Sequence, residues 1–260
     1  MSWPIDTTDA LNFEKLSTLA MKVKTIINVL FFTLIFQHGV AQETSSFLKN
    51  ADNFFKTYIK NGHVDYKAVK TNVSELDAIL NQAKNIVITK SDSKNYQAFW
   101  INGYNLHVIK GIVDNYPVKS PLDINGFFDK TKRAIGGKQI TLNDIENKLL
   151  RENFPKEARF HFVLVCAGLG CPPIINEAYT PDSLETQLQR QTKLALNNSN
   201  FIRVKGKKVQ LSQLFEWYKG DFTQDGKSEI DYINQFRSEK IATDAKVGYY
   251  AYDWTLNDTK

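Results

Sequence analysis

The stretch Arg159-Phe-His-Phe-Val-Leu-Val-Cys-Ala-Gly-Leu-Gly-Cys-Pro-Pro173 decides the fold prediction, because it joins a nearly continuous apolar run to a glycine-rich turn. It also contains the only two cysteines of the 260-residue chain. A short apolar run that ends at a glycine is typical of a strand covered on both faces. The sequence therefore predicts a buried strand over residues 160–167.

Alternation along this predicted strand separates its two chemically active side chains. Successive side chains of a strand point to opposite faces, so His161 and Cys166 would face opposite ways. They would also lie about 17 Å apart along the strand. We therefore expect that His161 and Cys166 are not direct partners.

Cys171 follows the turn Gly168-Leu-Gly170 and precedes Pro172-Pro173. Proline is tolerated in the first turn of a helix, which predicts a helix beginning here with Cys171 near its N-cap. The positive end of a helix dipole lowers a thiol pKa, so Cys171 is a candidate nucleophile. Two alternatives stay open: a Cys166–Cys171 disulfide, which needs the two Cα atoms within about 7 Å, and two buried thiols.

The N-terminal residues indicate export. A basic Met21-Lys-Val-Lys24 is followed by an apolar run over 25–36 and by small residues up to Ala41, which is typical of a secretory signal. The run is too short to cross a bilayer comfortably, although a retained anchor helix is the alternative. We expect a mis-called extension over 1–20, a signal peptide over 21–41 cleaved after Ala41, and a single periplasmic or extracellular domain over 42–260. No stable membrane anchor is expected after cleavage.

Composition and motifs exclude several classes of partner. The chain is 42% hydrophobic and 23% charged, and its net charge of +5 is spread along the sequence rather than clustered. Nucleic acid is therefore not an expected partner. His63, His107 and His161 are scattered and form no metal-binding motif, and no phosphate or dinucleotide loop is present, so we predict no metal and no cofactor.

The pattern of elements predicts an α+β fold with a single domain, in which helices pack on a small, mainly antiparallel sheet. Helical periodicity or capping residues predict helices at 43–60, 74–83, 91–115, 144–152, 182–197 and 228–237. Glycine turns predict hairpins at 132–141 and 201–211, and aromatic residues predict a last strand at 247–256.

The predicted helix 91–115 is apolar around most of its girth, yet it carries two asparagines in that apolar arc. Asn102 and Asn105 must find hydrogen bonds inside the protein or face a cleft, because a buried amide without partners is costly. Structural bonding is the favoured interpretation, and ligand binding is the alternative. His107 falls on the polar strip of this helix and is discounted as catalytic. On the next helix, Glu146 and Arg151 are placed to reach a polar site or to form an exposed ion pair.

Several motifs together resemble the domain of unknown function 547 family, over about residues 45–257. They are Phe99-Trp-Ile-Asn-Gly-Tyr-Asn105, Asp144-Ile-Glu146, Arg151, His161-Phe-Val-Leu-Val-Cys166, Cys171-Pro-Pro173, Glu177-Ala-Tyr179 and Tyr252-Asp-Trp-Thr-Leu-Asn257. Asn147 stands where the family usually has histidine, and Gly170 where it usually has serine. The resemblance implies no reaction.

Two functions from different classes follow. The first is a thiol-dependent hydrolase or acyl transferase, with Cys171 as nucleophile, His161 as base and Glu146 as an orienting group. Its candidate binding residues are Asn102, Asn105, Arg151 and Tyr179. The alternative is a non-catalytic module that binds a small molecule, peptide or glycan and carries a structural Cys166–Cys171 disulfide. Disulfide exchange fits less well, because the usual redox motif has two residues between its cysteines.

Overall fold

The structure is a computed structural model that describes Met21, Lys22, Lys24 and residues 42–259. The chain divides into two units, Met1–Glu43 and Thr44–Lys260, and the second contains every element discussed below. The predicted extension 1–20 and all but three residues of the predicted signal 21–41 lie outside the described residues. Within the described part, no helix is long and apolar enough to cross a membrane.

The first hydrophobic core of Thr44–Lys260 is built around α4 (Ser93–Asn115), a helix whose middle is buried on every side. Asp92 caps it by accepting a hydrogen bond from the Asn95 amide at 3.2 Å. The other helices and the small hairpin of this core are residues 44–58, β1 (Ile59–Lys60), β2 (His63–Val64), α2 (Tyr66–Thr71) and α3 (Val73–Asn85). The predicted helices at 43–60, 74–83 and 91–115 are confirmed.

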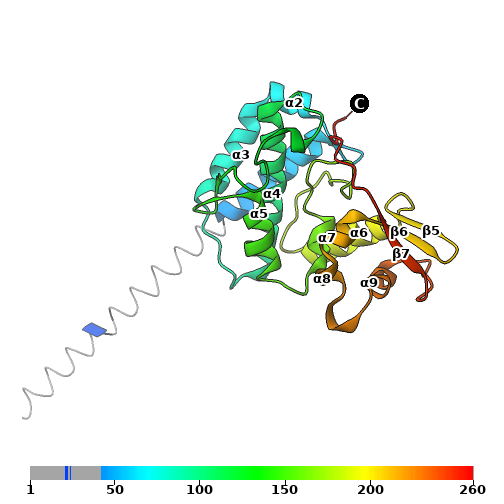
Figure 1. Cartoon of the computed structure of the whole chain (residues 1–260). Coiled ribbons are helices and arrows are strands. Elements are labelled where there is room, and N and C mark those ends of the chain that lie inside the picture. The colour runs from blue at the N-terminus through cyan, green and yellow to red at the C-terminus, as the bar shows by residue number, and fades with distance from the viewer. Residues whose placement is uncertain (1–20, 23, 25–41, 260) are drawn as a thin grey trace, which may run out of the picture. The chain divides into compact units, whose positions relative to one another are not determined.

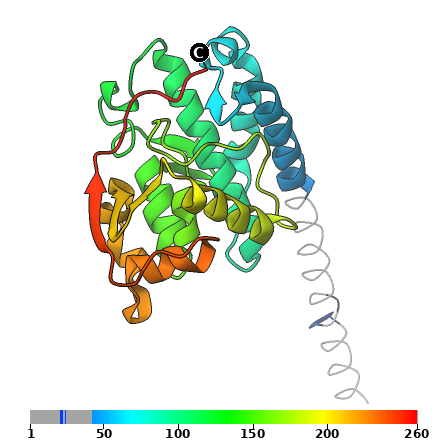
Figure 2. The same ribbon diagram turned by 90° about the vertical axis from the view of Figure 1, so that its right-hand side faces the viewer.

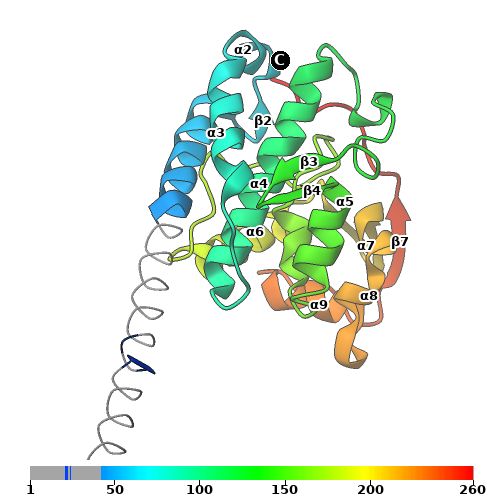
Figure 3. The ribbon, with the colours of Figure 1, turned by 90° about the vertical axis from the view of Figure 1, so that its left-hand side faces the viewer.

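The hairpin of β3 (Arg133–Ile135) and β4 (Lys138–Ile140) packs beside α4 (Figure 3). Its turn residues Gly136 and Gly137 both have positive φ, which glycine adopts without strain. At Gly103 of α4, a Cβ atom would lie 2.3 Å from the Ile135 side chain, so only glycine allows this approach. The chain then forms α5 (Leu142–Asp144), the π-helix η2 (Ile145–Arg151) and the 3-10 helix η3 (Ala158–Phe162).

A second core contains the other helices and the three-stranded sheet. Its elements are α6 (Leu184–Asn197), β5 (Ile202–Lys205), β6 (Lys208–Ser212), α7 (Gln213–Trp217), α8 (Lys219–Phe222), η4 (Gln224–Gly226), α9 (Glu229–Phe236) and β7 (Lys246–Tyr250). Figure 1 shows this group on one side of the domain and α2–α5 on the other. A further 3-10 turn, η1 (Pro121–Asp123), follows α4.

The sheets confirm the predicted α+β class. β5 pairs antiparallel with β6, with Val204 opposite Val209. β7 lies at the edge and pairs parallel with β6, with Val209 opposite Val247 (Figure 2). The described part of the chain has three small sheets, and every other pairing in them is antiparallel.

The predicted strand over 160–167 is wrong. Ala158–Phe162 is a 3-10 helix and the residues after it are irregular, although the segment is buried as expected. Its backbone groups find partners outside any sheet. Asn105 donates to the Val163 carbonyl at 3.0 Å and accepts from the Val165 amide at 2.9 Å. A buried apolar run therefore has its polar backbone satisfied by a side chain, which periodicity cannot reveal.

The helix predicted to begin at Pro172 is also wrong, because residues 172–183 are irregular and α6 begins only at Leu184. The glycine turn instead pairs with the C-terminal segment. The Leu169 amide donates to the Thr255 carbonyl at 2.8 Å, and the Gly170 amide donates to the Asp253 carbonyl at 2.7 Å. Cys171 is therefore not at a helix N-terminus, and the dipole argument for its reactivity fails.

His107 is buried rather than exposed, which corrects its predicted place on a polar strip. The hairpin and the loop before it cover this side of α4. Burial and the nearby charges of Arg133 and Lys110 lower the His107 pKa to about 3, so its ring is neutral at physiological pH. The helical period located the residue on a face of α4 but could not show that this face is covered.

Candidate functional site

Two cysteines and several titratable side chains meet in a cavity of about 70 Å³, here called the thiol pocket. It lies where the two cores meet, since Cys171 packs against both. Its lining residues are Tyr104, Glu146, His161, Leu164, Cys166, Cys171, Leu214, Trp217, Tyr218, Tyr252 and Trp254. The three predicted catalytic residues, Cys171, His161 and Glu146, are all among them.

The two sulfur atoms are in contact and share one hydroxyl group. The Sγ atoms of Cys166 and Cys171 are 2.6 Å apart. The Tyr252 hydroxyl lies 2.9 Å from the first and 2.8 Å from the second. The Cys166 amide also donates to the Cys171 sulfur at 3.0 Å. Both sulfurs are therefore held by hydrogen-bond donors at the floor of the pocket.

The predicted disulfide is absent from this structure, in which both cysteines are free thiols. The 2.6 Å separation exceeds the length of a disulfide bond, which is about 2.05 Å.

The surroundings of the two thiols shift their pKa values in opposite directions. Burial raises the pKa of Cys166, but hydrogen bonds from Cys171, Tyr252 and the Gly168 amide outweigh burial and lower this pKa. Burial raises the pKa of Cys171, and the hydrogen bond and charge of Cys166 raise it further. Cys166 is thus the thiol that ionises first and Cys171 the one that keeps its proton. The sequence argument had favoured Cys171 for the low pKa.

His161 belongs to a chain of polar contacts that runs away from the sulfurs. Its Nε2 lies 2.7 Å from Oδ2 of Asp221, and the ring packs against Tyr218 at a tilt of 34°, with 4.1 Å between centroids. Arg151 binds the same carboxylate through two nitrogens, at 2.7 and 2.9 Å. Burial raises the Asp221 pKa, but the bonds and charges of His161 and Arg151 outweigh it and hold this pKa well below its usual range.

Glu146 and Arg151 both belong to the π-helix, a rare conformation that is frequent at functional sites. Its widened turn is marked by the Glu152 amide, which donates to the Asn147 carbonyl at 2.8 Å. Burial raises the pKa of Tyr218, and the charge of Glu146 and a hydrogen bond to it raise this pKa further. Asn147, one of the two departures from the family pattern, accepts a hydrogen bond from Arg151.

Aromatic rings form one wall of the pocket. Trp217 and Trp254 stack with 6.0 Å between centroids, and Tyr252 lies 5.2 Å from the first ring and 4.8 Å from the second. Trp217 is 46% exposed, so this wall reaches the surface and offers a flat apolar contact beside the sulfurs. Cys171 also borders a second, more open cavity of about 270 Å³ that includes Arg203, Tyr250 and Asp253.

The predicted binding residues do not line the thiol pocket. Asn102 donates to the Tyr179 carbonyl at 2.7 Å and accepts from its amide at 3.0 Å, while Asn105 holds the backbone at Val163 and Val165. Tyr179 is buried, and Arg151 borders a separate polar cleft of about 230 Å³. Structural bonding, the favoured interpretation of the two asparagines, is what the structure contains.

Sequence reasoning missed Asp221 and gave no role to Tyr252. Asp221 lies among the aromatic and apolar residues that end at Phe222, but Glu216 is a second carboxylate in the same stretch, so the sequence offered no signal that singled out Asp221. Tyr252 belongs to a recognised motif, but its contact with the sulfurs depends on pairing between segments more than 80 residues apart. Gly170 allows this contact, because a Cβ there would lie 2.8 Å from the Tyr252 ring.

Within the described part of the chain, no group of three or more His, Cys, Asp or Glu side chains is arranged to hold a metal ion.

Comparison with known proteins gives a family and no activity. No curated protein and no solved structure matches the chain. Residues 88–196 match the model of the family described as "Protein of unknown function, DUF547". The matched segment contains Asn102, Glu146, His161 and both cysteines, whereas Asp221 and Tyr252 lie beyond it. The motifs and the match agree, and residues 88–196 match the DUF547 family.

Proposed function

We propose that Cys166 and Cys171 are the reactive pair of an exported thiol–disulfide exchange protein. The observation that carries the proposal is the 2.6 Å contact between the two sulfurs beneath the shared Tyr252 hydroxyl. Forming a bond between them needs only a small movement, because the S–S distance must fall from 2.6 Å to about 2.05 Å. Export, predicted from residues 21–41, belongs to the proposal because disulfides persist outside the cytoplasm.

The exchange begins with the Cys166 thiolate. It attacks one sulfur of a substrate disulfide, which forms a mixed disulfide and releases the other substrate sulfur as a thiolate. Cys171 then gives up its proton and attacks Cys166, which forms the Cys166–Cys171 bond and releases the second substrate sulfur. The substrate gains two electrons and the pair loses two. In reverse, the oxidised pair accepts two electrons from a substrate dithiol, whose sulfurs become a disulfide.

The opposite shifts of the two thiols support these roles. A thiolate is the attacking species, and Cys166 has the lowered pKa. Cys171 resolves the mixed disulfide, and because its pKa is raised it stays protonated until it reacts. Glu146 borders the same pocket and is the side chain that would receive the Cys171 proton.

Thiol-dependent acyl transfer is the second candidate, favoured by the hydrogen bond between His161 and Asp221. An imidazole held by a carboxylate is the usual base for a cysteine nucleophile such as Cys171. Exchange is preferred because, among the described residues, neither sulfur has a hydrogen bond to His161, while each contacts the other. A non-catalytic module that binds a peptide, glycan or small molecule is the remaining alternative.

A redox titration tests the proposal. The purified protein is equilibrated with mixtures of reduced and oxidised glutathione, and free thiols are trapped with iodoacetamide and counted by mass spectrometry. We expect a reversible two-electron equilibrium between about −270 and −120 mV, the range of known exchange proteins. A potential below about −300 mV indicates a structural disulfide and contradicts the proposal. Failure to form the bond contradicts it as well.

Variants separate exchange from acyl transfer. In Cys171→Ser, the remaining Cys166 is expected to accumulate as a mixed disulfide with glutathione, and in Cys166→Ser this product forms more slowly. His161→Ala is expected to change the exchange rate by only a few fold, because His161 bonds Asp221 and neither sulfur. Loss of all thiol reactivity in His161→Ala, with the fold intact, would favour acyl transfer.

A further inference from the structure

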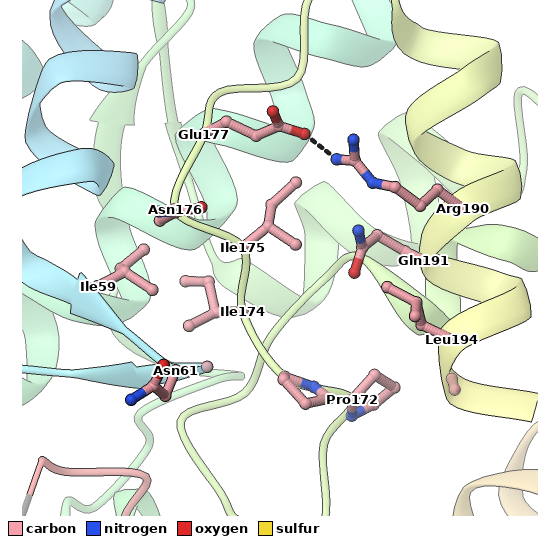
Figure 4. Close-up of a pocket in the computed structure, with 13 residues that line it drawn as sticks. Ile59, Asn61, Pro172, Ile174, Ile175, Asn176, Glu177, Arg190, Gln191 and Leu194 are labelled. Atoms are coloured by element: carbon pink, nitrogen blue, oxygen red, sulfur yellow. Dashed lines mark hydrogen bonds and ion pairs between the residues drawn. The ribbon is translucent and has the colours of Figure 1, made fainter. Parts of the chain in front are cut away.

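A groove of about 420 Å³ runs beside residues 172–177, here called the 172–177 groove (Figure 4). The segment passes between the β1–β2 hairpin, which contributes Ile59 and Asn61, and α6, which contributes Gln191 and Leu194. The volume falls within the usual range for ligand sites, which is about 300–1,000 Å³. This groove is the largest of the cavities described here.

The segment is irregular and unpaired: residues 172–175 have no assigned secondary structure, and the chain bends at Asn176 and Glu177. Figure 4 shows Ile174 and Asn176 directed to the hairpin side and Ile175 and Glu177 to the α6 side, so the side chains alternate even though the chain bends at Asn176 and Glu177. In the described structure, the amides and carbonyls of residues 174–177 have no hydrogen-bond partner. By contrast, the next two amides, at Ala178 and Tyr179, bond Asp52 and Asn102. A row of free backbone groups is a template for pairing with another strand.

The side chains around this row indicate what kind of residue would lie against it. Ile175 is half-buried on one wall, and Leu194 on the other is 60% exposed. At one end, Glu177 and Arg190 form an ion pair with both side chains partly exposed. The centre of the groove is therefore apolar and its end is charged. An extended peptide that has an apolar side chain at the centre matches both features, since backbone pairing supplies affinity and side-chain pockets supply selectivity.

We propose that the 172–177 groove binds an extended polypeptide segment, which pairs with the backbone of residues 174–175 and places an apolar side chain between Ile175 and Leu194. The groove shares Pro172, Pro173 and Ala195 with the cavity that Cys171 borders. A bound strand that continues past Pro172 reaches Cys171, whose sulfur lies 2.6 Å from that of the attacking Cys166. The inference rests on the proposed function in one respect, namely that the bound peptide is the substrate of exchange. The substrate class is then a protein with an unfolded or extended segment that contains cysteine.

Peptide binding is measured apart from thiol chemistry. Random dodecapeptides displayed on phage are selected against the double variant Cys166→Ser/Cys171→Ser, and the selected sequences are synthesised with a fluorescein label. We expect fluorescence anisotropy to show binding that Leu194→Asp weakens at least tenfold. The matched control is Leu122→Asp, since Leu122 is similarly exposed, at 56%, and lies outside the groove. Selection of no peptide, or of peptides that bind Leu194→Asp equally well, overturns the proposal.

Backbone pairing has its own signature. Single N-methyl groups are placed along the selected peptide, and only alternate positions are expected to lose binding, because every second residue of a paired strand directs its amide to the partner. Equal loss at all positions, or at none, contradicts pairing. Peptide binding without any glutathione equilibrium would leave the groove in place and overturn the exchange function. A reversible glutathione equilibrium without any peptide binding would leave the exchange function in place and overturn only the proposed peptide groove.

Discussion

Tyr252 is the residue on which the chemistry of the thiol pocket depends most. Burial raises its pKa well above the usual value, and the two cysteines raise it further, so the hydroxyl keeps its proton. A hydroxyl has one proton to donate, so it can stabilise a negative charge on only one sulfur at a time. The hydroxyl is equally close to both sulfurs, which allows it to follow the charge from Cys166 to Cys171 during exchange.

Tyr252→Phe is expected to raise the Cys166 pKa, because one of the hydrogen bonds that lowers it is lost. A hydrogen bond to a charged group is worth about 1.5–3 kcal/mol, so iodoacetamide alkylation at pH 7 should slow by roughly tenfold or more. The measurement is the alkylation rate against pH. Tyr250→Phe is the control, since that hydroxyl bonds the Phe201 carbonyl and neither sulfur. An unchanged rate profile in Tyr252→Phe would show that its hydroxyl does not stabilise the thiolate.

Asp221 makes the stability of the domain depend on pH, with a loss of stability in acid. Its folded-state pKa is depressed, so the stabilisation is complete above the unfolded-state pKa of about 3.9 and is lost as the pH falls toward the folded-state pKa. Denaturant unfolding at pH 6 and pH 3 should therefore show a larger loss of stability for the wild type than for Asp221→Asn. Equal losses would mean that the carboxylate is not stabilised by His161 and Arg151 as the contacts imply.

At the scale of elements, α4 organises the domain because its side chains form hydrogen bonds to the backbone of irregular segments, not because it packs on a sheet. Asn102 and Asn105 each bind both a carbonyl and an amide of a segment far away in sequence. The second of these contacts lies directly before Cys166. The position of the reactive pair is therefore fixed by a side chain of α4, at a place where regular secondary structure is absent.

Asn105→Ala tests this role. It leaves the Val163 carbonyl and the Val165 amide without their partner in a buried region, at about 1–3 kcal/mol for each group. We expect the free energy of unfolding to fall by about 2–5 kcal/mol, measured by urea denaturation. Asn115→Ala is the matched control at the exposed end of the same helix, where the amide bonds only the Gly111 carbonyl. A loss of similar size in both variants would contradict the bridging role of Asn105.

The sequence predicts elements where local signals act and fails where distant segments decide. Capping at Asp92, the Gly136-Gly137 turn and amphipathic spacing are local, and each element they predict is present. The segment around Cys166 has no such signal, because its backbone partners are Asn105 and the C-terminal residues near Leu256. The same dependence on distant segments explains which site residues the sequence could reveal. His161, Glu146 and both cysteines were recognisable by chemistry, whereas Asp221 reaches His161 across 60 residues of sequence.

At the scale of the whole molecule, the C-terminal segment connects the first core to the thiol pocket. Tyr252 and Trp254 border the pocket, and Asn257 accepts from Tyr66 at 2.7 Å in the first core. Between them, Leu256 pairs across Gly168 in the turn that separates the cysteines. All of these C-terminal residues lie beyond the segment that matches the family model. The pocket is therefore completed by parts of the chain that the match does not include.

Truncation after Thr255 separates the two tasks of this segment, since it keeps Tyr252 and Trp254 but removes the contacts to the first core. The lost bonds include those from the Val64 and Thr259 amides, from the Leu256 and Asn257 amides, and from the Tyr66 hydroxyl. At about 0.5–1.5 kcal/mol net for each bond, we expect stability to fall by about 3–7 kcal/mol. Hydrogen exchange should accelerate in residues 168–170 and 251–255, and alkylation of both cysteines should become faster, because the aromatic wall is no longer held against the sulfurs. Removal of Lys260 alone is the control. A truncated protein that unfolds at lower urea but retains the exchange protection and the alkylation rate would show that the pocket stands without its connection to the first core.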